Sequence, residues 1–175
     1  GGIVLGRLGV AWRVEASGAM QAIPGLGTQT NRACSVLLDS SVLAVGDGGS
    51  IHRLSGALVQ GEVSNTGRDL FAVAVNDSGE ALACGDGVVL RRGIDGTWRQ
   101  LSGIPNNPLR AAASLPDGSF LAVGDGGIAL RIKGDTATVV SPYPASVSLR
   151  VAVPLAGGQV FLAGDNGIAV LWDSV

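Results

Sequence analysis

The chain has few charged or aromatic side chains. Of its 175 residues only 15% are charged and 4% are aromatic, whereas 46% are hydrophobic. The formal net charge of −2 at pH 7 and the sequence pI near 5.2 give no overall positive potential. Binding to nucleic acid or to an anionic membrane surface is therefore not expected, and the hydrophobic fraction predicts a globular chain with a large core.

Long apolar runs are also missing. Polar or turn residues interrupt each run within about 10 residues, far short of the roughly 20 that a membrane-spanning helix requires, so we expect no membrane span. The chain begins Gly1-Gly2-Ile3-Val4, with neither an initiator methionine nor a basic segment ahead of an apolar one. No signal peptide is therefore expected, and a processed or excerpted chain is one interpretation of this beginning.

Residues that bind metals are scarce. The two cysteines, Cys34 and Cys84, fall in predicted strands and are expected to be buried thiols; a disulfide between them is the alternative. His52 is the only histidine, so the sequence does not offer the ligands of a tetrahedral zinc site. Three acidic turns offer one carboxylate each, too few for Ca²⁺; they contain Asp39, Asp77 and Asp117. No metal and no cofactor is predicted.

One short motif recurs along the whole chain. Gly-Asp-Gly or Gly-Asp-Asn begins at Gly46, Gly85, Gly124 and Gly164, at intervals of 39, 39 and 40 residues. A degenerate copy, Gly-Arg-Leu-Gly at residues 6–9, precedes Gly46 by 40 residues. A period of about 40 residues is typical of a four-stranded propeller blade. The glycines are expected in tight turns, where positive φ costs Gly little and costs Asp or Asn less than other residues.

Residues 110–140 show the predicted unit most clearly. Short segments at residues 110–115, 119–124, 128–132 and 136–140 are separated by turns rich in Gly and Asp. Four such segments in each repeat predict an all-β protein built from four-stranded antiparallel blades. The second segment of each unit is almost entirely apolar, as expected for a strand covered on both faces. These segments are residues 42–45, 81–84, 120–123 and 160–163.

The two terminal units are incomplete. The N-terminal stretch supplies segments two to four, at residues 3–6, 10–15 and 19–23, and the C-terminal stretch supplies segments one to three, at residues 150–155, 160–164 and 168–173. We predict a single propeller domain over residues 1–175, with five blades at about 1–27, 28–66, 67–105, 106–145 and 146–175. Either these blades close into a ring or the chain is part of a larger propeller. A solenoid is disfavoured because no terminal segment has the polar face of a cap.

Residues for catalysis are sparse. A Ser-His-Asp arrangement would have to use His52, which takes a repeat position otherwise held by large apolar residues. A glycosidase needs two carboxylates that face one sugar, but the three glutamates, Glu15, Glu62 and Glu80, occupy unrelated repeat positions. Tyr143, the only tyrosine, lies in a proline-rich turn. We therefore predict no catalytic residue and a protein that is not an enzyme.

The blade sequence resembles that of a known family. Residues 121–131, Leu-Ala-Val-Gly-Asp-Gly-Gly-Ile-Ala-Leu-Arg, and also residues 42–53 are similar to the repeat of the photosystem II assembly factor family and its relatives in non-photosynthetic bacteria. In that family an Asp-Gly-Gly-x-Thr-Trp segment, related to the Asp-box of sialidase-like propellers, follows the third strand; here only Asp95-Gly96-Thr97-Trp98 resembles it, in shortened form. The resemblance implies a scaffold that holds proteins or glycans, and it favours an extracytoplasmic or surface-associated location.

Aspartate and arginine recur in phase with the repeat. The aspartates that follow the recurring glycine are Asp47, Asp86, Asp125 and Asp165. The arginines on the predicted third strands are Arg13, Arg53, Arg91 and Arg131. Where both are present in the central units, the two lie five or six residues apart across a hairpin, so we expect structural Asp–Arg pairs within or between blades. An arginine surface that grips acidic peptides is the alternative.

A second arginine series marks a candidate binding site. Arg32, Arg110 and Arg150 begin the predicted first strands, and Phe71 takes the equivalent place in the remaining blade. First strands line the central channel of a propeller. The three guanidinium groups would converge near one mouth and repel one another unless an anion or carboxylate lay among them. We expect this set to contact a ligand or partner, with solvated rim charges as the alternative.

Two tryptophans complete the list of candidate binding residues. Trp12 and Trp172 lie on the predicted third strands of the two terminal blades, which would be neighbours in a closed ring. They are expected either to pack at the seam or to mark a surface that another protein covers.

The sequence therefore favours a non-catalytic scaffold for protein association or assembly, with a protein as the partner. The alternative is a carbohydrate or cell-surface recognition module of an extracellular or virion-associated assembly, in which Trp12 and Trp172 contact sugar. An Asp-box-type glycosidase is disfavoured.

Overall fold

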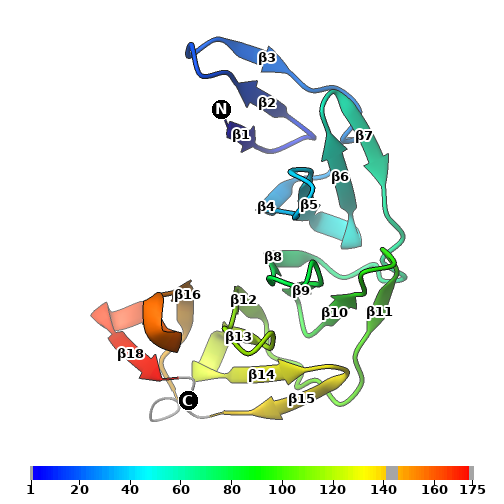
Figure 1. Cartoon of the computed structure of the whole chain (residues 1–175). Coiled ribbons are helices and arrows are strands. Elements are labelled where there is room, and N and C mark those ends of the chain that lie inside the picture. The colour runs from blue at the N-terminus through cyan, green and yellow to red at the C-terminus, as the bar shows by residue number, and fades with distance from the viewer. Residues whose placement is uncertain (1, 141–145, 174–175) are drawn as a thin grey trace.

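The computed structural model describes residues 2–140 and 146–173, which form five antiparallel β-sheets arranged in an open arc (Figure 1). Each sheet is a meander in which consecutive strands are neighbours. The first strand of each sheet lies at the inside of the arc and the last lies at its outside (Figure 1). This is the radial arrangement of propeller blades, so the predicted all-β propeller with incomplete terminal blades is confirmed.

The sheets are numbered 1 to 5 in chain order. Sheet 1 contains β1 (Gly2–Leu5), β2 (Ala11–Val14) and β3 (Met20–Ala22). Sheet 2 contains β4 (Asn31–Val36), β5 (Val42–Gly46), β6 (Ile51–Ser55) and β7 (Leu58–Gly61). Sheet 3 contains β8 (Leu70–Val75), β9 (Ala81–Gly85), β10 (Val89–Arg92) and β11 (Trp98–Gln100). Sheet 4 contains β12 (Leu109–Ser114), β13 (Phe120–Gly124), β14 (Ala129–Lys133) and β15 (Thr136–Val139). Sheet 5 contains β16 (Leu149–Pro154), β17 (Gln159–Gly164) and β18 (Ala169–Asp173). Short 3-10 turns are η1 (Asp47–Gly49), η2 (Asp125–Gly127), η3 (Ala156–Gly158) and η4 (Asp165–Gly167).

The strands lie within one or two residues of their predicted positions. The described residues hold eighteen strands in groups of three, four, four, four and three, the grouping that the aligned repeats predict. The apolar second segments β5, β9 and β13 are buried along their whole length. Among the described residues there is no helix of the length and apolarity that a bilayer crossing demands.

The recurring glycine is required by a close backbone approach. A Cβ on Gly46 would lie 2.0 Å from the carbonyl oxygen of Thr30, and one on Gly124 would lie 2.0 Å from that of Pro108. The backbone at Gly46 is extended, with φ of −169°, so positive φ is not the reason for glycine at this position. The predicted glycine with positive φ is found two residues later, at Gly48, where φ is 63°.

A β-bulge at the start of each inner strand causes this close approach. Asn31 lies opposite Gly46 and Ala33 lies opposite Val45, so that Arg32 is the extra residue of β4. The same register shift occurs at the start of β8, β12 and β16. A bulge bends the strand and redirects the extra side chain. The four bulge residues are Arg32, Phe71, Arg110 and Arg150.

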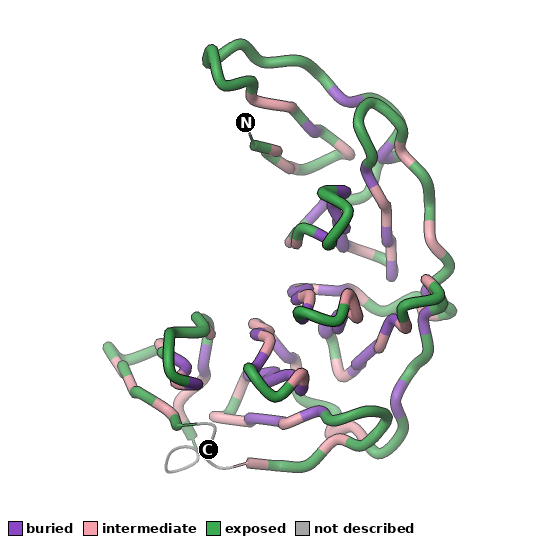
Figure 2. Tube along the Cα trace, in the orientation of Figure 1, coloured by how far each residue is buried: buried purple, intermediate pink, exposed green. Residues whose placement is uncertain are grey.

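The core consists of apolar layers between neighbouring sheets. The layer between sheets 3 and 4, for example, includes Leu82 and Cys84 from one sheet and Phe120 and Leu130 from the other. Burial is most complete in sheets 2 to 4, whereas the sheets at the two ends of the arc are largely exposed (Figure 2).

The first and last sheets do not adjoin in this arc (Figure 1). Trp12, 38% exposed, and Trp172, which packs partly buried against the layer between sheets 4 and 5, therefore lie at opposite ends of the molecule. They form no common seam in this structure.

One prediction about the cysteines is wrong. Cys84 is buried in β9, but Cys34 is exposed on β4, and both thiols are free. Cys34 takes the position of Val73 in the next sheet, where the side chain is covered by the preceding inner strand. Sheet 1 has no described strand inside β1, so nothing equivalent covers Cys34. Burial raises the pKa of the Cys84 thiol to about 12.

Candidate functional site

The four bulge residues form a row across the inner strands of four neighbouring sheets. We call Arg32, Phe71, Arg110 and Arg150, together with the aspartates that contact them, the inner ladder. Because each bulge is at the start of its inner strand, the four side chains lie at the same end of these strands, on the inside of the arc. The bulge supplies the common position, and the repeat's Gly-Asp motif supplies a carboxylate beside each bulge residue.

Paired charges make up the second half of the ladder. Arg110 holds Asp125 with both arms of its guanidinium group, from Nε to Oδ1 at 3.1 Å and from Nη2 to Oδ2 at 2.6 Å. Arg150 holds Asp165 in the same way, at 3.0 and 2.8 Å. Arg150 Nη1 also donates to Asp125 Oδ1 at 2.7 Å, so that Asp125 joins the two arginines. Bidentate pairs of this kind fix orientation as well as charge.

An aromatic ring connects the two halves of the ladder. The guanidinium carbon of Arg32 lies 5.3 Å from the centroid of the Phe71 ring, and that of Arg110 lies 4.7 Å from it. These are cation–π distances. Arg32 also pairs with Asp47 and lies 3.8 Å from a carboxylate oxygen of Asp69. The ladder is therefore continuous from sheet 2 to sheet 5.

In sheet 3 the bulge residue is Phe71, so the motif aspartate Asp86 has no bulge arginine to pair with. In sheets 2, 4 and 5 the motif aspartate pairs with the bulge arginine, but sheet 3 has Phe71 instead. Among the described residues, the Asp86 carboxylate makes no ion pair; Arg68 Nη1 instead donates to the backbone oxygen of Asp86 at 2.7 Å.

The ladder is a surface of alternating charge. Carboxylates do lie among the arginines, as their mutual repulsion requires, but they belong to the chain itself. The arginine partner Arg110 lowers the pKa of Asp125, and Arg150 lowers that of Asp165; in return Asp165 raises the pKa of Arg150. The arginine side chains stay 33% to 42% exposed, so these pairs add little stability and remain accessible to a partner.

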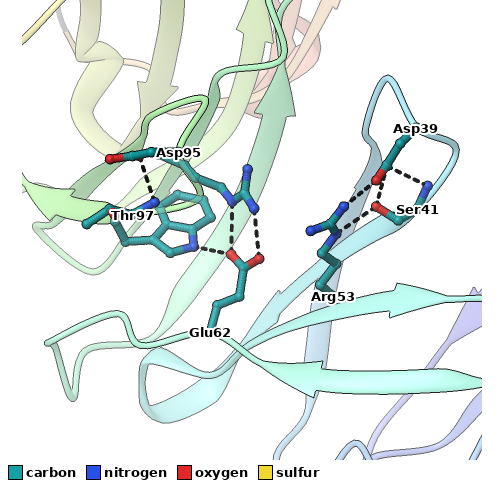
Figure 3. A network of polar contacts seen from close by, with 8 residues as sticks. Asp39, Ser41, Arg53, Glu62, Asp95 and Thr97 are labelled. Carbon is teal, nitrogen blue, oxygen red and sulfur yellow. Dashed lines mark hydrogen bonds and ion pairs between the residues drawn. The ribbon is translucent and has the colours of Figure 1, made fainter.

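The third-strand arginines do not pair with the motif aspartates as predicted. Arg53 instead binds Asp39, and its Nε donates to Ser41 Oγ at 2.9 Å, as Figure 3 shows. Arg53 lies opposite Leu43, on the side of the hairpin away from the Gly-Asp turn. Since a strand rises about 3.3 Å per residue, six residues carry the arginine out of reach of that turn and toward the preceding one. A hydrogen bond from the Ser41 hydroxyl is the main cause that lowers the pKa of Asp39 to about 2.

The same cluster recurs with variations in the other sheets. In sheet 4, Arg131 Nη2 donates to Asp117 Oδ2 at 3.0 Å. In sheet 3 the carboxylate moves to Glu80, which binds Arg91. Arg13 of sheet 1 donates to the backbone oxygen of Gly56 in sheet 2. These four arginines therefore brace hairpins and sheet contacts away from the inner ladder.

A buried ion pair was missed by the sequence reasoning. Arg92 donates to Glu62 through Nε and Nη2, each at 2.9 Å, and Trp98 Nε1 donates to Glu62 Oε2 at 2.6 Å. Figure 3 shows Glu62 beside the Asp95–Thr97 turn, in which Asp95 Oδ1 accepts from the Thr97 N–H at 3.0 Å. The Asp-box-like segment thus helps to join sheets 2 and 3. The only signal in the sequence was the second arginine of Arg91-Arg92, at a position that is Leu54 in sheet 2.

The residues examined for metal binding and catalysis do not come together. Within residues 2–140 and 146–173 no three potential metal ligands cluster. His52 is partly buried, which lowers its pKa, and its Nδ1 has no partner among the described residues. Tyr143 lies outside the described residues.

Comparisons with known proteins identify the architecture. No protein-family model and no curated protein sequence matches the chain significantly. Among solved structures, virginiamycin B lyase from Staphylococcus aureus has a TM-score of 0.78 at 11% identity, covering 95% of this chain and 63% of the lyase. YCF48 bound to a D1 peptide has a TM-score of 0.69 at 19% identity, covering 94% and 57%. The WD40 propeller domain of Doa1 has a TM-score of 0.76 at 15% identity, covering 95% and 61%.

These identities are low, so the likeness establishes the β-propeller fold and no activity. One of the three structures is a lyase and another holds a peptide, which shows how little the fold alone decides. The chain spans about three fifths of the length of these three proteins. The chain therefore belongs among β-propeller proteins by its fold.

Proposed function

We propose that the protein is a non-catalytic propeller scaffold for protein association, with residues 1–175 as one domain and the inner ladder as its contact surface. The observation that carries this proposal is the row of bulge side chains, repeated across four sheets, whose three arginine side chains are each a third or more exposed. Arginine and aromatic residues are enriched at protein interfaces. The peptide-bound YCF48 and the WD40 domain, which share the fold, support this role, as does the sequence resemblance to assembly factors.

The electrostatics of the ladder favour binding over catalysis. A general acid or base works best when its pKa lies near the working pH. Here Arg110 lowers the pKa of Asp125, Arg150 lowers the pKa of Asp165, and Asp165 raises the pKa of Arg150, so these three groups move away from neutrality. Charges held in this way suit recognition of a polar partner segment with complementary alternating charge.

Recognition of a glycan by the two tryptophans gains no support from the geometry. A sugar stacked on both Trp12 and Trp172 would require the two rings to lie together. Trp12 is on β2 and Trp172 is on β18, and these strands lie at opposite ends of the arc (Figure 1). The protein partner is therefore the stronger hypothesis.

Photo-crosslinking tests the contact surface. Benzoylphenylalanine in place of Phe71 would sit in the middle of the ladder, and the same residue in place of Val139, exposed on the outer strand β15, is the matched control. With extract from the source organism, we expect a crosslinked protein from position 71 and none from position 139.

A charge reversal then tests the ladder's chemistry. Arg110→Glu combined with Arg150→Glu is expected to lower the crosslinking yield at position 71 at least tenfold. Arg99→Glu combined with Lys133→Glu makes the same change of net charge on other strands and should leave the yield unchanged. Equal yields from both double variants, with unchanged circular dichroism, would show that the ladder is not the contact surface.

A further inference from the structure

We propose that Arg53 and Arg92 bind a carboxylate ligand in the cavity between sheets 2 and 3. The ligand is a carboxylate with a short apolar body, either a free organic acid or an acidic side chain of a partner protein. Both sheets have four strands and lie in the middle of the chain, and the cavity is lined by residues outside the inner ladder. The inference therefore does not rest on the proposed function.

The first observation is that Glu62 and Arg92 occupy two positions that are apolar at the other contacts between neighbouring sheets. The Glu62 position is the residue whose N–H closes the fourth segment onto the third strand, and the Arg92 position is the fourth residue of the third strand in the next sheet. The equivalent pairs, each within one apolar layer, are Ile23 with Leu54, Leu101 with Ile132, and Val140 with Trp172. The repeat is thus broken at both positions of one contact.

Stability gives no reason for this exchange. The side chain of Arg92 is 6% exposed and that of Glu62 is 13% exposed. Replacing a buried ion pair by well-packed apolar residues is often neutral or stabilising, because taking two charges out of water is expensive. An apolar pair, as at the other contacts, would therefore join sheets 2 and 3 at least as well. The ion pair at this place points to a role in binding.

The second observation is that two arginines keep donors free at this contact. Arg92 uses Nε and Nη2 to hold Glu62, and its Nη1 makes no hydrogen bond to a described residue. Arg53 uses Nε for Ser41 Oγ and Nη2 for Asp39, and its Nη1 is likewise without a partner among the described residues. Figure 3 shows the unbonded end of the Arg53 guanidinium group directed toward the side on which Glu62 lies. Each group can therefore donate to a further oxygen.

The third observation is that both arginines line the same space. Two cavities with volumes of about 230 and 430 Å³ share Arg53, Arg92, Asp95 and Gly96 in their linings, so they adjoin each other. The Asp95 carboxylate does not occupy the two arginines: its Oδ1 accepts from the Thr97 N–H, and Figure 3 shows it beside Thr97, on the far side of the turn from Arg53. The space between the guanidinium groups is open to a ligand.

The donors and the rim define the chemistry of the ligand. Two guanidinium groups on opposite walls suit the two oxygens of a carboxylate. Each guanidinium charge is already balanced by a carboxylate of the chain, which favours a singly charged ligand over a phosphate dianion. Apolar side chains at the rim offer a surface for the rest of the ligand. They are Leu38 and Ile94 in the smaller cavity and Val63 in the larger, and they are 67%, 79% and 73% exposed.

An NMR titration with 4-methylpentanoate tests the site, with 4-methylpentanamide as the uncharged control of the same shape. The reporters are the Nε–H signals of Arg53 and Arg92 and the indole N–H of Trp98, which donates to Glu62. We expect saturable shifts with the acid and an affinity at least tenfold lower for the amide. The indole signals of Trp12 and Trp172, on sheets 1 and 5, should not move.

A matched pair of variants tests the arginine that belongs to sheet 2. Arg53→Gln should lower the affinity for 4-methylpentanoate at least tenfold, because one of the two donors is lost. Arg131→Gln makes the same change at the equivalent position of sheet 4 and should leave the affinity unchanged. Equal effects of the two variants would overturn the proposal, as would equal affinities for the acid and the amide.

A double variant separates binding from folding. Glu62→Leu combined with Arg92→Leu restores the apolar pair of the other contacts, so the protein should keep its circular dichroism and its unfolding temperature should not fall. The affinity for 4-methylpentanoate, followed at the Arg53 signal, should fall at least tenfold. Unchanged affinity in this variant would show that the ion pair does not form the site.

Two further measurements place the site and identify the source of the carboxylate. The double variant Arg110→Glu, Arg150→Glu should bind 4-methylpentanoate as well as the parent protein does, and loss of binding would move the site to the inner ladder and overturn the proposal. The peptide acetyl-Val-Glu-Leu-amide should compete for the same site. Tighter binding of the peptide supports an acidic side chain of a partner protein, and tighter binding of 4-methylpentanoate supports a free organic acid.

Discussion

The contact between sheets 3 and 4 and the contact between sheets 1 and 2 use the same repeat positions, yet they differ in polarity. In the first contact the three positions on the later sheet are apolar: Leu109, Ile128 and Leu130. In the second they are polar: Asn31, Ser50 and His52. Each of these three polar side chains has a buried atom without a hydrogen-bond partner among the described residues. The polar residues thus gather where the neighbouring sheet has no described inner strand.

This difference shows what the repeat does and does not determine. The spacing of glycines and apolar segments determines the backbone of each sheet, because it specifies turns and strand lengths. The character of a contact depends on how many strands face each other across it. Buried polar atoms without partners carry a cost that apolar side chains do not, so the contact between sheets 1 and 2 is expected to be weaker than the contact between sheets 3 and 4.

Truncation of Leu130 and of His52, which occupy equivalent positions in the two contacts, gives the largest expected difference in stability. Leu130→Ala leaves a cavity in a complete apolar layer and should lower the free energy of unfolding by about 3 kcal/mol. His52→Ala, at the equivalent position in the contact between sheets 1 and 2, should cost less than about 1 kcal/mol, because it removes a ring whose buried Nδ1 has no hydrogen-bond partner among the described residues. His52→Leu, which restores the repeat's residue, should not destabilise the protein. Urea unfolding of the three variants measures this, and equal losses for the two alanine variants would mean that the contacts do not differ.

The recurring glycine tests the same comparison at the backbone. A Cβ at Gly124 would lie 2.0 Å from Pro108 O, whereas at Gly6 the nearest atom would be Val10 Cβ at 3.8 Å. Gly124→Ala should therefore destabilise the protein by about 2 to 3 kcal/mol through overpacking. Gly6→Ala should change stability by less than about 0.5 kcal/mol, since a Cβ there meets no backbone atom closer than 3.9 Å. The two variants can be ranked by thermal unfolding followed by circular dichroism; a large loss for Gly6→Ala would show that the glycine serves another purpose.

The fold could be predicted from the sequence because the repeat carries local and redundant signals. Four copies of Gly-Asp at one spacing, each beside an apolar strand, allow few arrangements, and the eighteen strands follow from them. The candidate site could be predicted only in part. The alignment brought Arg32, Phe71, Arg110 and Arg150 to equivalent positions, which the bulge then places in one row.

The pairing of charges could not be predicted because it depends on the direction of side chains along a hairpin. Sequence distance suggested Asp47 with Arg53, but the extended strand carries Arg53 to Asp39 instead. The buried pair of Glu62 and Arg92 joins two sheets, and nothing near either residue in the sequence points to the other. Cys34 is exposed because sheet 1 has no described inner strand in front of β4, a consequence of the incomplete first unit that the prediction of a buried thiol left out.

The smallest expected effect concerns pH and compares two hairpins. The turn of sheet 2 has Asp39, Ser41 and Arg53, whereas the equivalent turn of sheet 5 has Gly157 and pairs with a strand that carries Leu171 in the arginine's place. Asp39 has a folded pKa of about 2, below the ordinary value near 3.9, so its stabilising contribution is present above pH 5 and is lost as the pH falls toward 2. The turn of sheet 5 has Gly157 in place of the aspartate, so it adds no such dependence of stability on pH.

Carboxyl NMR of Asp39 and unfolding measurements at pH 6 and pH 3 would test this. The Asp39 carboxyl should titrate near pH 2 in the parent protein and closer to pH 4 in Ser41→Ala, because the serine hydroxyl is the main cause of the shift. Asp39→Asn should lose less stability than the parent between pH 6 and pH 3, since the group that takes up the proton is gone. The exposed position keeps the effect small. A midpoint near 4 in the parent protein would mean that the Asp39–Ser41–Arg53 cluster does not hold the carboxylate in solution.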